Sequence, residues 1–287
     1  MRIFDNTECK LGEGALWHPE LKRLFWFDIL GSKLYALSND TASSWSFDEM
    51  VSAAGWIDKQ ELLIASETAL FRFNIETGKR TDLAPLEAEN SITRSNDGRA
   101  DPWGGFWIGT MGKSAEPKAG AIYRYYAGEV RQLFGEITIP NAICFAPDQS
   151  CAYFTDTPTR QVMRQPLDAQ DGWPVGDPEL FLDLNAEGLN PDGAVTDVDG
   201  NLWIACWGDG AVRAFNHKGE QIERIEAKAK HLTCPALGGL DYSTLFVTSA
   251  QQGVADSELK IQAAGQTFFE NVRSQGMPEP AVIIERD

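Results

Sequence analysis

The segment DVDGNLWIACWGDGAVRAF (197–215) carries the pattern that decides the fold: a turn rich in Asp and Gly, a short apolar run, a second turn and another apolar run. Apolar runs of this kind recur along the whole chain. The six runs are LFWFDI (24–29), LLIAS (62–66), FWIGT (106–110), AYFTDT (152–157), LWIAC (202–206) and LFVTSA (245–250), and their starts are 38, 44, 46, 50 and 43 residues apart. Repeats of about 40–50 residues built from short strands are typical of propeller blades. The sequence therefore predicts an all-β protein, a six-bladed β-propeller.

The same pattern predicts a single domain over residues 1–287. The repeat resumes in phase after the Gly- and Asp-rich stretch 171–193, so we interpret that stretch as a long loop and not as a domain linker. MRIF (1–4) and AVIIERD (281–287) are strand-like, and we expect them to complete the last blade together and close the ring. Residues 221–231 fit either a short helix or an outer strand with its loop.

Composition excludes several classes of partner. The chain has 25 Lys and Arg against 42 Asp and Glu, a net charge of −17. Nucleic acid requires a basic surface, and an anionic membrane repels an acidic one. No run approaches the roughly 18 apolar residues of a spanning helix, and residues 1–10 are too charged for a signal peptide. The five cysteines form no CxxC pair and indicate buried thiols in a reducing compartment. We therefore expect a cytoplasmic protein; nothing in the sequence indicates its oligomeric state.

Six residues in the same phase of the repeat predict a ring of side chains. About ten or eleven positions before the apolar runs stand, in chain order, Glu13, Ser52, Asn96, Asn141, Asp192 and Cys234. The innermost strand of each blade lines the central channel, so equivalent positions should meet at the channel mouth. Four of the six are Glu, Asn or Asp, which carry side-chain oxygen atoms.

Such a ring predicts a metal site. Carboxylates held together raise one another's pKa, and a bound cation removes that conflict. Oxygen ligands without His or Cys favour a hard cation such as calcium or magnesium, with manganese as an alternative. Asn and Asp also serve as turn residues that bond to local backbone, which would account for any one of them alone. Four in one phase favour a metal site at the channel mouth.

Four motifs are spread over the chain: GEGALW (12–17), RSNDGRADPWGGFWIGTM (94–111), IPNAICFAPD (139–148) and PDGAVTDVDGNLWIACW (191–207). In this order they resemble the motifs of the gluconolactonase, regucalcin and senescence-marker-protein family of six-bladed propellers. The resemblance implies that Glu13, Asn141 and Asp192 hold one divalent metal ion. Calcium is the first choice, and zinc, magnesium, manganese and iron are also used in the family.

The resemblance also implies how a substrate is held. Arg94 and Asn96 match residues that bind the substrate's oxygens, and Asp192 matches the family's general base. Glu116 is the nearest match to a further acidic residue that contacts substrate, displaced by a residue or two. Trp207, the last residue of the fourth motif, is a core residue by default but lies just past a channel strand, where it could form one wall of the substrate pocket. We expect His231, which lies outside the motifs, to be a non-catalytic neighbour.

Together these features predict a metal-dependent hydrolase that opens a sugar-acid lactone, an aldonolactone. The attacking water would be activated either by Asp192 or by the cation. Two alternatives remain open: a calcium-dependent organophosphate or aryl-ester hydrolase of the same fold, and a non-enzymatic propeller that binds calcium or a protein. Arg94 and Asn96 favour a small polyhydroxylated substrate over an apolar ester, because both offer polar hydrogen-bonding groups.

Overall fold

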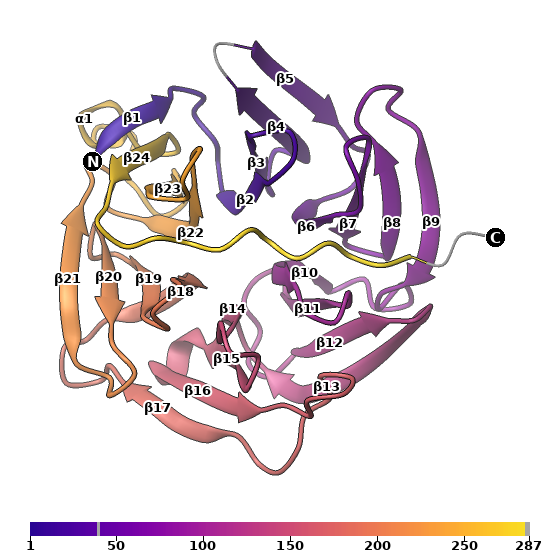
Figure 1. Cartoon of the computed structure of the whole chain (residues 1–287). Coiled ribbons are helices and arrows are strands. Elements are labelled where there is room, and N and C mark those ends of the chain that lie inside the picture. The colour runs from indigo at the N-terminus through magenta and orange to yellow at the C-terminus, as the bar shows by residue number, and fades with distance from the viewer. Residues whose placement is uncertain (39–40, 285–287) are drawn as a thin grey trace.

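Six four-stranded antiparallel sheets surround a central channel in the computed structural model, which describes residues 1–38 and 41–284 (Figure 1). Five sheets are built from four consecutive strands each. The sixth joins three strands near the C-terminus to one strand from the N-terminus. An apolar cluster fills the gap between each pair of neighbouring sheets. The prediction of an all-β, six-bladed propeller is confirmed.

Each sheet runs from the channel outward in the order of its strands. The innermost strands are β2 (Gly12–His18), β6 (Val51–Trp56), β10 (Thr93–Ala100), β14 (Pro140–Phe145), β18 (Asn190–Thr196) and β22 (Leu232–Gly238). The second strands, which contain the six apolar runs, are β3 (Arg23–Asp28), β7 (Glu61–Ser66), β11 (Phe106–Gly112), β15 (Cys151–Asp156), β19 (Leu202–Trp207) and β23 (Thr244–Ser249).

The outer half of each sheet is more exposed. The third strands are β4 (Lys33–Ser38), β8 (Ala69–Asn74), β12 (Gly120–Tyr126), β16 (Gln161–Pro166), β20 (Ala211–Phe215) and β24 (Thr267–Asn271). The outermost are β5 (Thr41–Ser46), β9 (Arg80–Pro85), β13 (Glu129–Ile137), β17 (Glu179–Asp183), β21 (Gln221–Glu226) and β1 (Arg2–Asp5). Of the two interpretations of residues 221–231, β21 confirms the outer strand.

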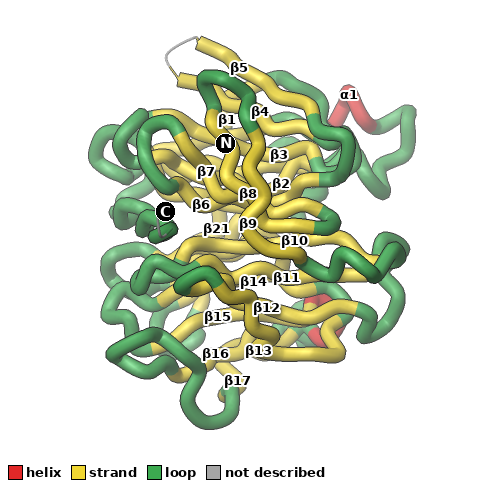
Figure 2. The backbone as a smooth tube through the Cα atoms, turned by 90° about the vertical axis from the view of Figure 1, so that its right-hand side faces the viewer, coloured by secondary structure: helices red, strands yellow, loops and turns green. Residues whose placement is uncertain are grey.

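Helices are short and peripheral. The 3-10 helix η1 (Thr157–Thr159) follows β15, and α1 (Leu259–Gln262) precedes β24. Figure 2 shows α1 on the face of the propeller opposite to the C-terminus. Among the described residues, none of the helices is long and apolar enough to cross a membrane.

The turn between the first and second strand of every sheet is capped by one side chain. In chain order these residues are His18, Asp58, Asp101, Asp148, Asp197 and Asp241, and each accepts a backbone N–H two to four residues further on. Asp side chains favour such turns because they satisfy the amides that the turn leaves unpaired. The repeated Asp-rich turn in the sequence is therefore what folds each blade locally.

The ring is closed by the N-terminal strand. β1 pairs antiparallel with β24, with Arg2 opposite Phe269 and Ile3 opposite Phe268, as expected for residues 1–4. The C-terminal part of that prediction is wrong for residues 281–284, which form no strand; residues 285–287 lie outside the described residues.

The C-terminal segment crosses the end of the channel instead (Figure 1). The N–H of Val282 donates to the oxygen of Trp56, and that of Ile283 to the oxygen of Gly104. Two features explain why the C-terminal segment lies here and not in the last sheet. The outer edge of the last sheet is already occupied by β1, and Val282 packs so closely on Gly55 that any larger residue there would collide with it.

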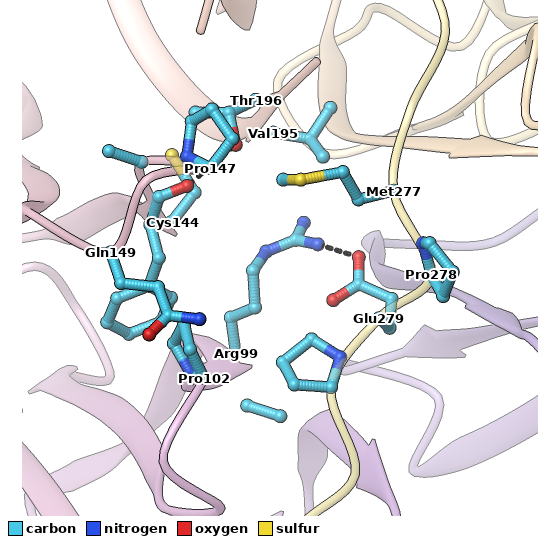
Figure 3. A pocket seen from close by; sticks show the side chains of 14 residues that line it. Arg99, Pro102, Cys144, Pro147, Gln149, Val195, Thr196, Met277, Pro278 and Glu279 are labelled. Atoms are coloured by element: carbon cyan, nitrogen blue, oxygen red, sulfur yellow. Dashed lines mark hydrogen bonds and ion pairs between the residues drawn. The ribbon is translucent and has the colours of Figure 1, made fainter. Parts of the chain in front are cut away.

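This segment also closes a small cavity of about 230 Å³ at that end of the channel (Figure 3). Glu279, from the segment, forms an ion pair with Arg99 of β10 inside the propeller. Arg99 also donates to the carbonyl oxygen of Ala194, at 3.1 Å. The C-terminal segment is thus anchored to the inner strands by charge as well as by backbone hydrogen bonds. All five cysteines are buried free thiols, as expected.

Candidate active site

Five of the six predicted site residues line one cavity of about 380 Å³ at the opposite end of the channel: Glu13, Arg94, Asn96, Asn141 and Asp192. They come from the beginnings of the four inner strands β2, β10, β14 and β18. Residues near the ends of three of these strands, β10, β14 and β18, line the other cavity, so the two cavities lie at opposite ends of the channel. The structure therefore brings together residues that are up to 179 positions apart in the chain, from Glu13 to Asp192.

A β-bulge places each ring residue. The pairing of every inner strand with its neighbour slips at the predicted ring position, and the slips span 13–16, 51–53, 95–98, 141–144, 191–194 and 232–235. Bulges bend a strand and re-aim a side chain. Close packing accompanies them: Gly14 has a positive φ of 57° and faces the oxygen of Ser52 with no space for a Cβ. The backbone therefore requires a glycine directly after Glu13.

The two carboxyl groups of the cavity are strongly perturbed. Glu13 and Asp192 are 6% and 5% exposed. Burial, followed by the charge of Asp97, raises the pKa of Glu13 to about 8. Burial, followed by the charge of Glu13, raises the pKa of Asp192 well above its usual value. Burial also lowers the pKa of Arg94 to about 10, opposed by the charges of Glu13 and Asp192. Without a bound cation, the surroundings thus favour the neutral, protonated form of both carboxyl groups.

A chain of hydrogen bonds crosses the cavity wall. Arg94 Nη1 donates to Asn96 Oδ1 at 2.8 Å, and Asn96 Nδ2 donates to Asn141 Oδ1 at 3.0 Å. Asn141 Nδ2 donates to Thr157 Oγ1 at 2.9 Å, and Thr157 Oγ1 donates to the oxygen of Pro191 at 2.8 Å. The chain joins three neighbouring blades and ends at the residue before Asp192.

Glu116 is the one predicted site residue that does not line the cavity. Its Oε2 accepts the N–H of Ser114 at 3.0 Å, so the side chain is folded onto its own loop. Ser114 and Ala115 of that loop do line the cavity. Glu116 shapes the rim, and its direct contact with substrate stays a prediction.

Several cavity residues were not predicted. Thr157 lies in η1, outside the repeated phase, and only its hydrogen bonds reveal it. Lys113 lines the cavity, and its Nζ contacts Glu67 Oε1 at 2.5 Å and the oxygen of Ser91 at 3.0 Å.

Trp207 lines the cavity, as the sequence allowed, and stacks on His231 with ring centroids 4.3 Å apart. His231 therefore lies behind Trp207 and not in the cavity lining.

Among residues 1–38 and 41–284, no three His, Cys, Asp or Glu side chains cluster in a metal-binding arrangement. The predicted ligand set is compatible with this finding because it contains only two carboxylates, Glu13 and Asp192. Its third member is the amide of Asn141.

Comparison with known proteins identifies relatives along the whole chain. A model of the SMP-30/Gluconolactonase/LRE-like region matches residues 11–251. A Rhizobium meliloti protein provisionally named a sugar lactone lactonase is 40% identical over 283 residues, 98% of this chain and 96% of the relative. An L-arabinolactonase of Azospirillum brasilense is 33% identical over 283 residues, 96% of this chain and 93% of the relative.

The solved structures agree. The crystal structure of a calcium-binding protein, regucalcin, from Agrobacterium tumefaciens superimposes with a TM-score of 0.96 at 40% identity. The match covers 99% of this chain and 97% of that one. The arrangement of the six blades is therefore the same in both proteins over nearly their entire length.

Proposed function

The chain belongs to the SMP-30/Gluconolactonase/LRE-like family, and from this premise we propose that it is a lactonase that opens a sugar-acid lactone with the help of one divalent cation. The observation that carries the proposal is the convergence of Glu13, Asp192, Asn141 and Arg94 on one cavity. Its volume of about 380 Å³ falls within the roughly 300–1,000 Å³ of small-molecule sites. Relatives named for lactone hydrolysis support the substrate class.

The donor set fits a hard cation. Burial raises the pKa of both carboxyl groups, and so do neighbouring charges, that of Asp97 for Glu13 and that of Glu13 for Asp192; a bound cation would favour the charged form of both. Glu13, Asn141 and Asp192 would hold it through oxygen alone, which suits calcium, magnesium or manganese. The calcium-binding Agrobacterium relative supports calcium as the first choice; magnesium, manganese, zinc and iron are outcomes of the test below.

The residues of the site have separate roles in the proposed reaction. A cation bound here supplies a Lewis acid for the lactone carbonyl. Asp192 accepts a proton from a water whose oxygen adds to the carbonyl carbon, and that proton is later available to the ring oxygen as the ring C–O bond breaks. Arg94 and Asn96 orient the sugar hydroxyls, Arg94 through its planar fork of donors. The product is the open-chain hydroxy acid. The buried free thiols support action in a reducing compartment such as the cytoplasm.

The substrate class is tested with a panel of lactones. Five- and six-carbon aldonolactones, an aryl ester and an organophosphate are offered to the purified protein, and hydrolysis is followed by proton release. We expect turnover of the aldonolactones and little of the others, because the cavity wall carries polar groups that an apolar ester leaves unpaired. Preferential hydrolysis of the aryl ester or organophosphate would replace the proposal with the alternative hydrolase; no hydrolysis at all would favour a non-enzymatic propeller.

Removal of the cation is expected to abolish activity. Protein purified without added metal should contain about one divalent ion per chain, as measured by elemental analysis, because the buried carboxylates require compensation. An excess of chelator should abolish hydrolysis. Calcium, magnesium, manganese, zinc or iron is then added singly, and the cation that fits the site best should restore the most activity. Full activity in excess chelator would overturn the metal-dependent proposal and leave the substrate class standing.

Replacement of Arg94 by alanine is expected to impair substrate binding without loss of the cation. Arg94→Ala should raise the KM for sugar lactones and lower kcat, because the orienting donors are lost. The metal content should stay at the parent's level, since Asn96 Nδ2 is still fixed by the oxygen of Pro140, at 2.9 Å. Parallel steady-state kinetics and elemental analysis check both parts. Equal loss of metal and activity would mean that Arg94 acts on the cation site instead.

A further inference from the structure

The hydrogen-bond chain through Asn141 has only one allowed direction. At one end, the oxygen of Pro191 is a backbone carbonyl and can only accept. The hydroxyl of Thr157 has a single proton, which it donates to that oxygen at 2.8 Å. Thr157 Oγ1 must therefore be an acceptor on its other side, where it receives Asn141 Nδ2 at 2.9 Å. The orientation of the Asn141 amide is thus decided by Thr157.

The other end of the chain agrees with this direction. Asn96 Nδ2 donates to the oxygen of Pro140 and to Asn141 Oδ1, at 2.9 and 3.0 Å. Arg94 can only donate hydrogen bonds, and it donates one to Asn96 Oδ1, so the Asn96 oxygen must be on that side. Asn141 Oδ1 accepts one hydrogen bond and retains a second lone pair. Oxygen and nitrogen of an amide differ little in shape, so only these hydrogen bonds determine that Asn141 offers an oxygen and not an N–H.

We propose that Thr157 is a positioning residue for the cation: it holds Asn141 with Oδ1 available as a ligand and ties it to the backbone just before Asp192. This inference rests on the proposed function. Without the hydroxyl, Asn141 Nδ2 loses its acceptor, and only the hydrogen bond from Asn96 still opposes a turn of the amide, which would direct N–H donors toward a cation that repels them. Thr157 therefore links two of the three proposed ligands, which come from the neighbouring strands β14 and β18.

A second threonine provides a matched control. Thr196 Oγ1 donates to the oxygen of Phe145 at 2.6 Å and so joins the same two blades near the far end of the channel. Thr196→Val removes the same kind of bond between the same blades but leaves Asn141 untouched. If Thr157 acts only by holding the two blades together, Thr196→Val should therefore weaken cation binding as much as Thr157→Val does.

The experiment measures cation affinity directly. Chelator-treated parent, Thr157→Val, Thr157→Ser and Thr196→Val are titrated calorimetrically with Ca²⁺ and with Mn²⁺. Loss of a residue that orients a metal ligand typically weakens binding about 10–100-fold, and we expect that loss for Thr157→Val. Thr157→Ser retains the hydroxyl and should bind close to the parent, as should Thr196→Val. The activity deficit of Thr157→Val should shrink as the cation concentration is raised.

The possible outcomes distinguish failure of the inference about Thr157 from failure of the proposed metal-dependent function. If the parent binds and Thr157→Val loses no more affinity than Thr196→Val, Thr157 is structural and the inference is overturned while the proposed function stands. If serine fails to restore affinity, the hydroxyl is not the cause and the inference is equally overturned. If the parent binds neither Ca²⁺ nor Mn²⁺, the titration is repeated with Mg²⁺, Zn²⁺ and Fe²⁺, and failure to bind any of the five overturns the metal-dependent function and the inference with it. Circular dichroism monitors folding, and Thr157→Ala replaces the valine variant should that variant not fold.

Discussion

Asp192→Asn is expected to reduce lactone turnover by about 10²–10⁴-fold, the range typical of general-base assistance. Asparagine is close to aspartate in shape and keeps one oxygen for a cation, but it cannot accept a proton. Asp192 is buried at the cavity, beside the second carboxyl group of Glu13, so no bulk water can substitute for it easily. The measurement is kcat on the best aldonolactone at saturating cation, so that weaker binding of the cation is not counted as lost chemistry.

The control for this variant is Ser52→Ala. Ser52 occupies the equivalent ring position of a blade that contributes no proposed ligand, and its Oγ donates to Ser95 Oγ at 2.8 Å. Loss of that bond should leave turnover within a few-fold of the parent, since neither serine lines the cavity. Turnover of Asp192→Asn within tenfold of the parent would show that Asp192 is at most a ligand. The proton of the attacking water would then be taken up elsewhere.

The fold was predictable because each blade repeats its chemistry locally. An apolar run such as LWIAC (202–206) recurs in every blade, and an Asp-capped turn such as that of Asp197 recurs in five of the six, so several weak signals support one another. The convergence of Glu13, Asn141 and Asp192 was predictable for the same reason: equivalent positions of a closed ring must meet. Their catalytic roles follow from the resemblance and remain predictions.

What the sequence could not show depends on contacts outside the repeat. The strand-like residues 281–284 could have paired with any free edge. Their position follows only from contacts outside the repeat: the backbone hydrogen bonds to Trp56 and Gly104 and the packing of Val282 on Gly55. Thr157 belongs to a turn of ordinary composition. Its importance comes from the direction of a hydrogen-bond chain, which no spacing of residues encodes.

A buried ion pair within one blade, between the turn after β10 and the strand β12, gives the largest expected effect on stability. Arg124 Nε donates to Asp101 Oδ2 at 2.7 Å, and both side chains are fully buried. The other oxygen of Asp101 caps its turn by accepting the N–H groups of Trp103 and Gly105, each at 2.9 Å. Asp101 thus stabilises both a turn and a buried charge, and asparagine can replace only the first function.

Asp101→Asn is therefore expected to lower the free energy of unfolding by about 3–5 kcal/mol, the usual effect of removing one partner from a buried ion pair. If the amide oxygen keeps the turn, the amide N–H₂ faces the N–H of Arg124, and donor meets donor beside an uncompensated charge. Urea unfolding followed by tryptophan fluorescence measures the change as a shift of the midpoint at unchanged slope. Asp148→Asn is the matched control: its exposed carboxylate caps the corresponding turn of the next blade through Ser150, and we expect a change within about 0.5 kcal/mol.

A double variant decides whether charge or shape is responsible. The guanidinium of Arg124 lies 4.3 Å from the ring centroid of Tyr126 and 4.5 Å from that of Trp173, so an apolar side chain of similar length can pack in its place. Asp101→Asn combined with Arg124→Met removes the uncompensated charge and should be more stable than Asp101→Asn alone, because the desolvated cation is the main source of the loss. A double variant that is less stable than the single one would contradict this account. It would mean that the packing of Arg124 between the two rings, and not its pairing with Asp101, stabilises the blade.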